Sequence, residues 1–178
     1  MKHQSDILAL KYRPTDFKDL IGQEYLVETI QKSIELNKIP NAYIFTGIRG
    51  VGKTTTARIV AKMLNCTAFD QNNKPDLNNC DQAKAISEDR HPDVIEIDAA
   101  SNTSVENARE IIENVKYNPV LGKYKVYIID EVHMLSKSAF NALLKTLEEP
   151  PPHSKFIFAT TEISKVPITI LSRCQRFD

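Results

Sequence analysis

The sequence predicts an α/β fold built on a mostly parallel sheet, and three observations point to it. Short apolar runs alternate with amphipathic helical segments, which is the order that gives parallel strands joined by helices. The glycine-rich stretch GIRGVGKT, residues 47–54, stands between an apolar run and a helical segment. Two later apolar runs end in carboxylate or hydroxyl side chains, at the end of the strand where open α/β sheets bind ligands.

The first three elements follow from apolar spacing. Apolar residues recur every four positions over 23–37, which predicts an amphipathic helix after a short lead-in. The run AYIFTG at 42–47 is apolar and ends in glycine, as a buried strand does. Residues 53–64 combine strong helix formers with one apolar face, so we expect a helix directly after the glycine-rich loop.

The middle of the chain is expected to hold a loop, a strand and a helix. Residues 67–82 are dominated by Asn, Asp and Gln, which predicts an inserted surface loop. The run VIEID at 94–98 predicts a strand, and one apolar face over 104–116 predicts a helix. Thr103 and Glu106 have the spacing of a capping box at the start of that helix.

The last part alternates in the same way. KVYIID at 125–130 and KFIFATT at 155–161 predict strands, and the segment between them predicts a helix over 137–148. Pro150 and the two prolines after it end that helix. The chain stops at 174–178, inside an expected strand, so we expect residues 1–178 to be one domain of a longer protein.

Composition excludes some classes of protein. Hydrophobic residues at 42% and charged residues at 26% are typical of a soluble globular chain. A formal net charge of +0 argues against nucleic-acid binding through overall basicity. No apolar run approaches the ~20 residues of a membrane span, and no signal peptide is visible. Three widely spaced cysteines make no disulfide framework, so we expect a cytoplasmic protein without a membrane partner.

The loop 47–54 has the spacing of a phosphate-binding loop. Its glycines let the backbone turn sharply and aim amide N–H groups at one anion, and the following helix adds its positive dipole end. Lys53 is expected to reach the β- and γ-phosphates, and the Thr54 hydroxyl to bind Mg²⁺. The alternative is a glycine-rich turn with no ligand. The loop residues expected to bind the nucleotide are Gly47, Arg49, Gly50, Val51, Gly52, Lys53, Thr54 and Thr55.

Polar residues at the strand ends complete the predicted site. Asp130 is expected to hold Mg²⁺ through water, and Glu131 to orient or deprotonate the attacking water. The alternative is that both are solvated strand-end acids. A hydroxyl of Thr160 or Thr161 could position the same water, although threonine is also common in strands. Arg173 could reach a neighbour's γ-phosphate in a ring, whereas in a lone domain it would be a surface residue. Together these residues predict a nucleoside-triphosphate-binding and hydrolysing domain.

At this point the chain resembles a known family over nearly its whole length. The segments resemble, in order, those of the nucleotide-binding domain of bacterial DNA polymerase III gamma/tau subunits, which are clamp-loader ATPases of the AAA+ class. The block from Ile128 to Pro151 is far more specific than the glycine-rich loop. The segments are YRPTDFKDLIGQE, GIRGVGKTTTARIVAKMLNC, IEIDAASN, IIDEVHMLSKSAFNALLKTLEEPP, FIFATT and LSRC.

The resemblance implies an AAA+ P-loop NTPase fold with five parallel strands and ATP and Mg²⁺ as ligands. The strand before Thr161 would lie between those leading to Gly47 and Asp130. Implied partners are other gamma/tau copies, delta-type subunits, the sliding clamp and primer-template DNA in the bacterial cytoplasm. ATP binding would open the clamp and hydrolysis would release the loaded complex. The parent protein would be classed with DNA-directed DNA polymerases, although the chemistry expected of this domain is ATP hydrolysis.

The resemblance also assigns roles to single residues. Thr161 would be the first sensor, and Arg173 an arginine finger acting in trans on a neighbouring subunit. Arg109 would face template phosphates, with a solvated helix residue as the equal alternative. Residues implied to line the adenine pocket are Tyr12, Arg13, Pro14 and the turn at Ile21 and Gly22.

The sequence departs from the family in two ways. Relatives commonly bind structural zinc with four cysteines after the loop helix, but only Cys66 and Cys80 remain here. Lys74 and Leu77 stand where the middle thiols would be, and His91 is the only other nearby ligand. We therefore expect no zinc site and two free thiols. Residues 1–178 do not extend to the helical lid that follows in relatives, so we expect these residues in isolation to form a monomer that hydrolyses ATP slowly.

Other functions remain open from the sequence. ATP could serve only as structural glue, although the carboxylate of Glu131 favours hydrolysis. A branch-migration helicase subunit would be expected to lack the SRC and FNALLKTLEEPP segments, and a nucleotide kinase would need a second lid rich in arginine. His133 has no metal-ligand partner at helical spacing, so we expect it to pack or to form hydrogen bonds.

Overall fold

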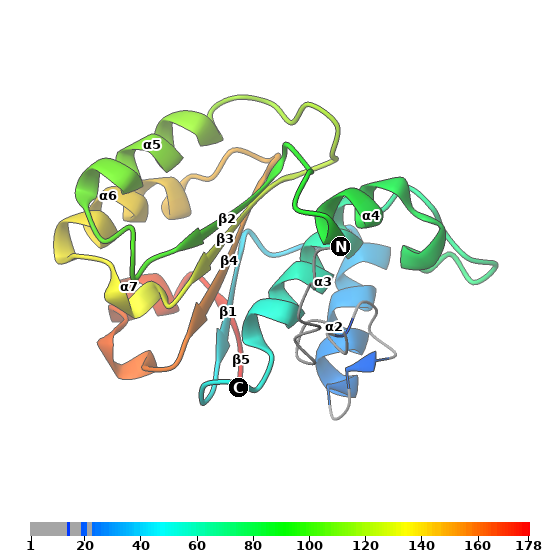
Figure 1. Ribbon diagram of the computed structural model, residues 1–178, viewed down its shortest axis with the longest axis horizontal. Coiled ribbons are helices and arrows are strands. Elements are labelled where there is room, and N and C mark those ends of the chain that lie inside the picture. Colours follow the sequence, from blue (N-terminus) through cyan, green and yellow to red (C-terminus); the bar gives the residue numbers. More distant parts are fainter. Residues whose placement is uncertain (1–13, 15–18, 21–22) are drawn as a thin grey trace, which may run out of the picture.

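The computed structural model describes residue 14, residues 19–20 and residues 23–178. A five-stranded sheet lies at the centre of the fold (Figure 1). The strand order is β2-β3-β4-β1-β5, and every neighbouring pair is parallel. The fold class is therefore as predicted, and β4 lies between β1 and β3 as the resemblance implied. The strands are β1 (Ala42–Thr46), β2 (Val94–Asp98), β3 (Lys125–Asp130), β4 (Ser154–Thr160) and β5 (Gln175–Phe177).

Helices cover both faces of the sheet. In Figure 1, α2, α3 and α4 lie on one side, and α5, α6 and α7 on the other. A separate apolar cluster fills each interface, and consecutive residues of β1 alternate between them: Tyr43 and Phe45 pack toward α3, whereas Ala42 and Ile44 pack toward the opposite helices. The helices are α2 (Glu24–Glu35), α3 (Lys53–Asn65), α4 (Asp81–Ser87), α5 (Val105–Val115), α6 (Lys137–Glu148) and α7 (Ile168–Leu171).

Burial on both faces explains why the central strands are continuous apolar runs in the sequence. Every residue of β4 is buried, as are the first four residues of β1 and the four central residues of β3. The helix bounds predicted at 137–148 and the strand bounds predicted at 94–98 and 125–130 are confirmed. None of the described helices is long and apolar enough to cross a membrane.

The capping box predicted at the start of α5 is wrong. The helix begins one residue later than expected, so Ser104 is the N-cap, and its hydroxyl accepts a hydrogen bond from Asn107 N at 3.3 Å. Thr103 instead offers its carbonyl oxygen to Ser136 N, which ties the start of α5 to the start of α6.

The segment 67–82 is more ordered than a surface loop. Phe69 and Pro75 form an antiparallel bridge, and a 3-10 turn follows at Leu77–Asn79. Leu77 and Cys80 are buried in the cluster around α3. The helix that starts at Asp81 was not predicted, because only Ala83 and Ile86 of its residues are apolar and buried.

Candidate functional site

The loop after β1 and the ends of three strands enclose a pocket of about 760 Å³. Strand register sets its position, since Thr46 lies opposite Thr160 and Asp98 lies opposite Asp130, so these strands end together. The sequence placed the site at this edge of the sheet. The lining residues are Arg49, Gly50, Gly52, Lys53, Thr54, Thr55, Asp98, Ala100, Asp130, Glu131, His133, Met134 and Thr161.

The glycines give the loop a backbone that other residues rarely adopt. Gly50 and Gly52 have φ values of 85° and 92°, which is the region where an L side chain is strained. Gly52 is also the N-cap of α3 and, as a glycine, makes no side-chain capping hydrogen bond. Gly52, Lys53, Thr54 and Thr55 line the pocket, so the positive end of the helix faces it, which is the arrangement that binds phosphates in other proteins.

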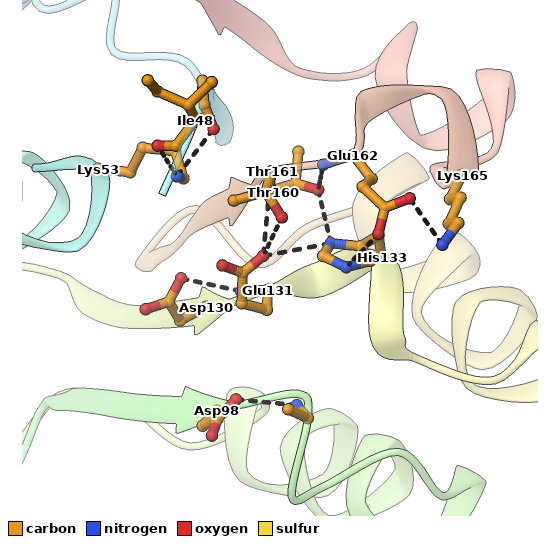
Figure 2. Close-up of polar contacts among 12 residues, drawn as sticks. Ile48, Lys53, Asp98, Asp130, Glu131, His133, Thr160, Thr161, Glu162 and Lys165 are labelled. Atoms are coloured by element: carbon orange, nitrogen blue, oxygen red, sulfur yellow. Dashed lines mark hydrogen bonds and ion pairs between the residues drawn. The ribbon is translucent and has the colours of Figure 1, made fainter. Parts of the chain in front are cut away.

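Lys53 holds a positive charge inside the loop. Its side chain is largely buried, and Nζ donates to the carbonyl oxygens of Gly47 and Ile48, each at 2.9 Å (Figure 2). An ammonium group has three donors, so these two bonds orient the group and leave one donor for a ligand. A polyphosphate in this pocket would meet a charge that is already positioned.

Thr54 and Asp130 bring two oxygen ligands together. Thr54 Oγ1 donates to Asp130 Oδ2 at 2.5 Å, although the two residues are 76 positions apart in the chain. The other carboxylate oxygen of Asp130 accepts from Glu131 N at 2.9 Å. Hydroxyl and carboxylate oxygens are hard ligands of the kind Mg²⁺ takes, usually together with water and substrate phosphates. The residues present therefore fit a magnesium ion.

Glu131 is held by Thr161. Its Oε2 accepts from Thr161 Oγ1 at 2.9 Å and from Thr161 N at 3.2 Å (Figure 2). Glu131 also has φ 48° and ψ 46°, a left-handed conformation that costs a non-glycine residue free energy of about 1–3 kcal/mol. The amide and hydroxyl of Thr161 therefore fix the carboxylate of Glu131, which lines the pocket and has a strained backbone.

Not all predicted residues lie in the large pocket. Gly47 and Val51 border an adjoining pocket of about 210 Å³ instead. Arg173 forms an ion pair with Glu148 and is not among the residues lining the large pocket, and Arg109 is exposed on α5. Of the implied adenine-pocket residues, Pro14 is partly buried, and Tyr12, Arg13, Ile21 and Gly22 lie outside the described residues.

Sequence reasoning missed four lining residues. Asp98 had the same signal as Asp130, since it ends an apolar strand, but it was not singled out. Ala100 and Met134 carried no signal. His133 was expected to pack or to form hydrogen bonds, and its 2.9 Å contact with Thr160 Oγ1 shows the second.

The residues considered for zinc are engaged with other groups. Cys66 Sγ donates to Ala68 O at 3.1 Å, and burial raises the pKa of this thiol to about 12. Both ring nitrogens of His91 have partners, in the side chain of Gln82 and the amide of Asp93, and burial lowers its pKa. Within the described residues, no three Cys, His, Asp or Glu residues are grouped to hold a metal ion. The absence of zinc stays a prediction.

Comparisons with known proteins agree with this architecture. The family model described as DNA polymerase III, delta subunit, matches residues 22–178. The chain is 52% identical over 171 residues to the DNA polymerase III subunit tau/gamma of Haemophilus influenzae and to the subunit tau of Escherichia coli, covering 96% of this chain in each case. It is 53% identical over 167 residues to the subunit tau of Bacillus subtilis, covering 94% of this chain. The chain spans 25%, 26% and 29% of those three relatives.

Solved structures share the fold at lower identity. A DNA polymerase III gamma subunit-related protein of Thermotoga maritima superposes with a TM-score of 0.57 at 24% identity, over 85% of this chain and 44% of that one. The RuvB Holliday junction branch migration motor of Thermotoga maritima gives 0.60 at 18% identity, over 94% and 49% of the two chains. The fold is thus that of an AAA+ P-loop domain. From its sequence and family-model matches, the chain belongs to the family of DNA polymerase III tau/gamma subunits.

Proposed function

We propose that this chain binds ATP with Mg²⁺ in the pocket at the strand ends and hydrolyses it. The observation that carries the proposal is the contact between Thr54 and Asp130, which joins the loop to the strand that also delivers Glu131. A glycine-rich turn without a ligand would need neither the Asp130 carboxylate nor the Glu131 carboxylate beside it. The charge of Lys53 and the open N-terminus of α3 supply the phosphate site.

Each side chain then has a task in hydrolysis. The loop amides and Lys53 bind the β- and γ-phosphates, and Thr54 and Asp130 hold Mg²⁺. When bound, the metal ion neutralises phosphate charge. Glu131, oriented by Thr161, accepts a proton from or aligns the attacking water. In this scheme Thr161 positions the carboxylate rather than taking part in proton transfer itself.

The adjoining pocket suits the base of the nucleotide. It lies beside Gly47 and is lined by the apolar side chains of Leu26, Phe45 and Phe177 and by polar or charged residues that include Gln23, Thr56 and Asp178. A purine ring needs such flat apolar walls and a few polar groups. We place adenine here, with Tyr12, Arg13, Pro14 and Ile21 as further contacts expected from the family resemblance.

We further propose that ATP hydrolysis serves clamp loading during DNA replication in the bacterial cytoplasm. The tau and gamma names of the relatives support this role. Arg173, on the turn after α7 and away from this chain's own large pocket, would complete a neighbouring subunit's site. Arg109, which is exposed on α5, would contact template phosphates. The partners are other copies of this subunit, delta-type subunits, the sliding clamp and primed DNA.

ATP turnover by the full-length subunit in its complex tests this function. Hydrolysis that rises when both primed DNA and clamp are added supports a motor that loads clamps. Binding of ATP without turnover under any of these conditions would favour the second candidate, in which ATP only stabilises the assembly. Glu131 is the observation against that candidate, because a purely structural site has no need of a positioned acid.

A further inference from the structure

The ring of His133 lies between two carboxylates beside the site (Figure 2). It stands on the 3-10 turn Val132–Met134, and its side chain is 5% exposed. Nδ1 is 2.9 Å from Thr160 Oγ1 and 3.3 Å from Glu131 Oε2. Nε2 is 3.4 Å from Glu162 Oε1 on the opposite side of the ring. Both nitrogens of a buried imidazole therefore face oxygen atoms.

The groups around the ring are themselves fixed. Thr160 is fully buried at the end of β4, and its hydroxyl also accepts from Glu162 N at 3.0 Å. The Glu162 carboxylate pairs with Lys165 Nζ at 2.6 Å, and this hydrogen bond is the main cause of its lowered pKa. The ring is thus held in one orientation by Thr160, at the end of β4, and by Glu162, which directly precedes the turn Ile163–Lys165.

The contacts on Glu131 are unequal between its two oxygens. All the contacts described for this carboxylate fall on Oε2: the hydroxyl and the amide of Thr161, and Nδ1 of His133. Oε1 is the oxygen left for a water molecule in the pocket that Glu131 lines. A carboxylate held at one oxygen from two sides presents the other oxygen in a defined direction.

We propose that His133 is a positioning residue for Glu131: the Nδ1 edge of its ring fixes Oε2, so that Oε1 is directed at the attacking water. This inference rests on the proposed ATP hydrolysis and adds to it a residue outside the phosphate loop and the strand ends. It also gives a reason for the two ring contacts to differ. The Nδ1 contact serves the site, whereas the Nε2 contact with Glu162 only anchors the ring.

Two substitutions of His133 by amide side chains test the Nδ1 contact and the Nε2 contact separately. In His133→Asn the side-chain amide nitrogen can take the place of Nδ1, and in His133→Gln it can take the place of Nε2. His133→Leu keeps a buried side chain of similar bulk without either ring nitrogen. The three variants are compared with the unaltered protein as full-length subunits in the assembled complex, by ATP turnover, ATP binding and thermal unfolding.

We expect kcat to fall about tenfold in His133→Leu and His133→Gln, with KM for ATP unchanged, because an interaction that matters only during hydrolysis affects kcat. His133→Asn should keep kcat within about threefold of the unaltered complex. If kcat falls equally in His133→Asn and His133→Gln, together with the unfolding temperature, the ring has only a structural role and the proposal is overturned. Unchanged kcat in all three would overturn it as well. If the unaltered complex binds ATP without turnover, the proposed hydrolysis itself fails, and this inference fails with it.

Discussion

The Thr54 hydroxyl donates a 2.5 Å hydrogen bond to the carboxylate of Asp130, and this contact joins the first turn of α3 to the end of β3. It brings together the two oxygen atoms that we propose as ligands of Mg²⁺. The parallel sheet makes this contact possible. Strands β1 and β3 are separated only by β4, and all three end at the same edge of the sheet, so the loop after β1 lies near the end of β3.

Replacing Thr54 tests the proposed magnesium site. Thr54→Val has nearly the same shape but no hydroxyl, so we expect ATP binding to lose most of its dependence on Mg²⁺. Thr54→Ser keeps the hydroxyl and should retain that dependence. Titrating Mg²⁺ at fixed ATP and following nucleotide binding distinguishes the two variants. An identical magnesium response in Val and Ser variants would exclude Thr54 as a ligand.

Glu131→Gln is expected to separate binding from hydrolysis. The amide keeps the size of the side chain and can still accept from Thr161, but it cannot take a proton. Turnover by the assembled complex should fall by about 10²–10⁴-fold, the usual contribution of a general base. ATP affinity should stay within about threefold, since Glu131 is not a phosphate ligand in this scheme. A loss of ATP binding equal to the loss of turnover would contradict that assignment.

The carboxylate of Asp93 is expected to stabilise the fold far from the site. Asp93 is buried, and it accepts from the amides of Val120, Leu121 and Gly122, each at 2.7 Å. Burial raises the pKa of this carboxyl, but the amide hydrogen bonds outweigh burial, and the pKa lies below its ordinary value of 3.8. The stabilisation is therefore complete above that value and is lost as the pH falls through the lowered pKa.

Asp93→Asn should lower the free energy of unfolding by about 3 kcal/mol at neutral pH, because amide donors lose a charged acceptor. It should also remove part of the fall in stability below about pH 4. Glu110→Gln, on the exposed surface of α5, is the control and should change stability by less than about 0.5 kcal/mol. Denaturant unfolding across pH measures both effects. Equal stability of Asp93→Asn and Glu110→Gln would show that the three hydrogen bonds contribute little.

The purified protein is expected to contain no stoichiometric zinc. Cys66 and Cys80 are free thiols, and tetrahedral zinc needs four ligands. Elemental analysis of protein prepared without chelator should find well under one zinc per chain, and a chelator should leave the unfolding temperature unchanged. One bound zinc per chain, released together with a drop in unfolding temperature, would show that other residues complete a site.

The strands were predictable because their pattern is local. A run of apolar residues ending in Asp130 carries both its burial and its boundary in the sequence. Helix α4 was not predictable in this way, since Ala83 is buried in a cluster that includes residues distant in sequence, such as Val126 and Ile157. The start of α5 was misplaced by one residue because Thr103 and Ser104 are both good caps, and only tertiary contacts choose between them.

The site residues likewise differ in whether a local sequence pattern could predict them. Lys53 and Thr54 were predicted from motif spacing alone. The role proposed for His133 depends on a ring orientation set by Thr160 and Glu162, which lie 27 and 29 residues further along the chain. Pairing of β3 with β4 brings these residues together, and no pattern within a single segment records it.

ATP binding by the Lys53→Ala variant tests the central claim most directly. Lys84→Ala, an exposed position on α4 away from the pocket, is the matched control. Equilibrium binding of ATP with Mg²⁺ should weaken by about 10- to 150-fold in Lys53→Ala, which corresponds to the loss of about 1.5–3 kcal/mol from a hydrogen bond to a charged group. Lys84→Ala should bind as the unaltered chain does. Equal ATP affinity in Lys53→Ala and Lys84→Ala would contradict a phosphate site at this loop.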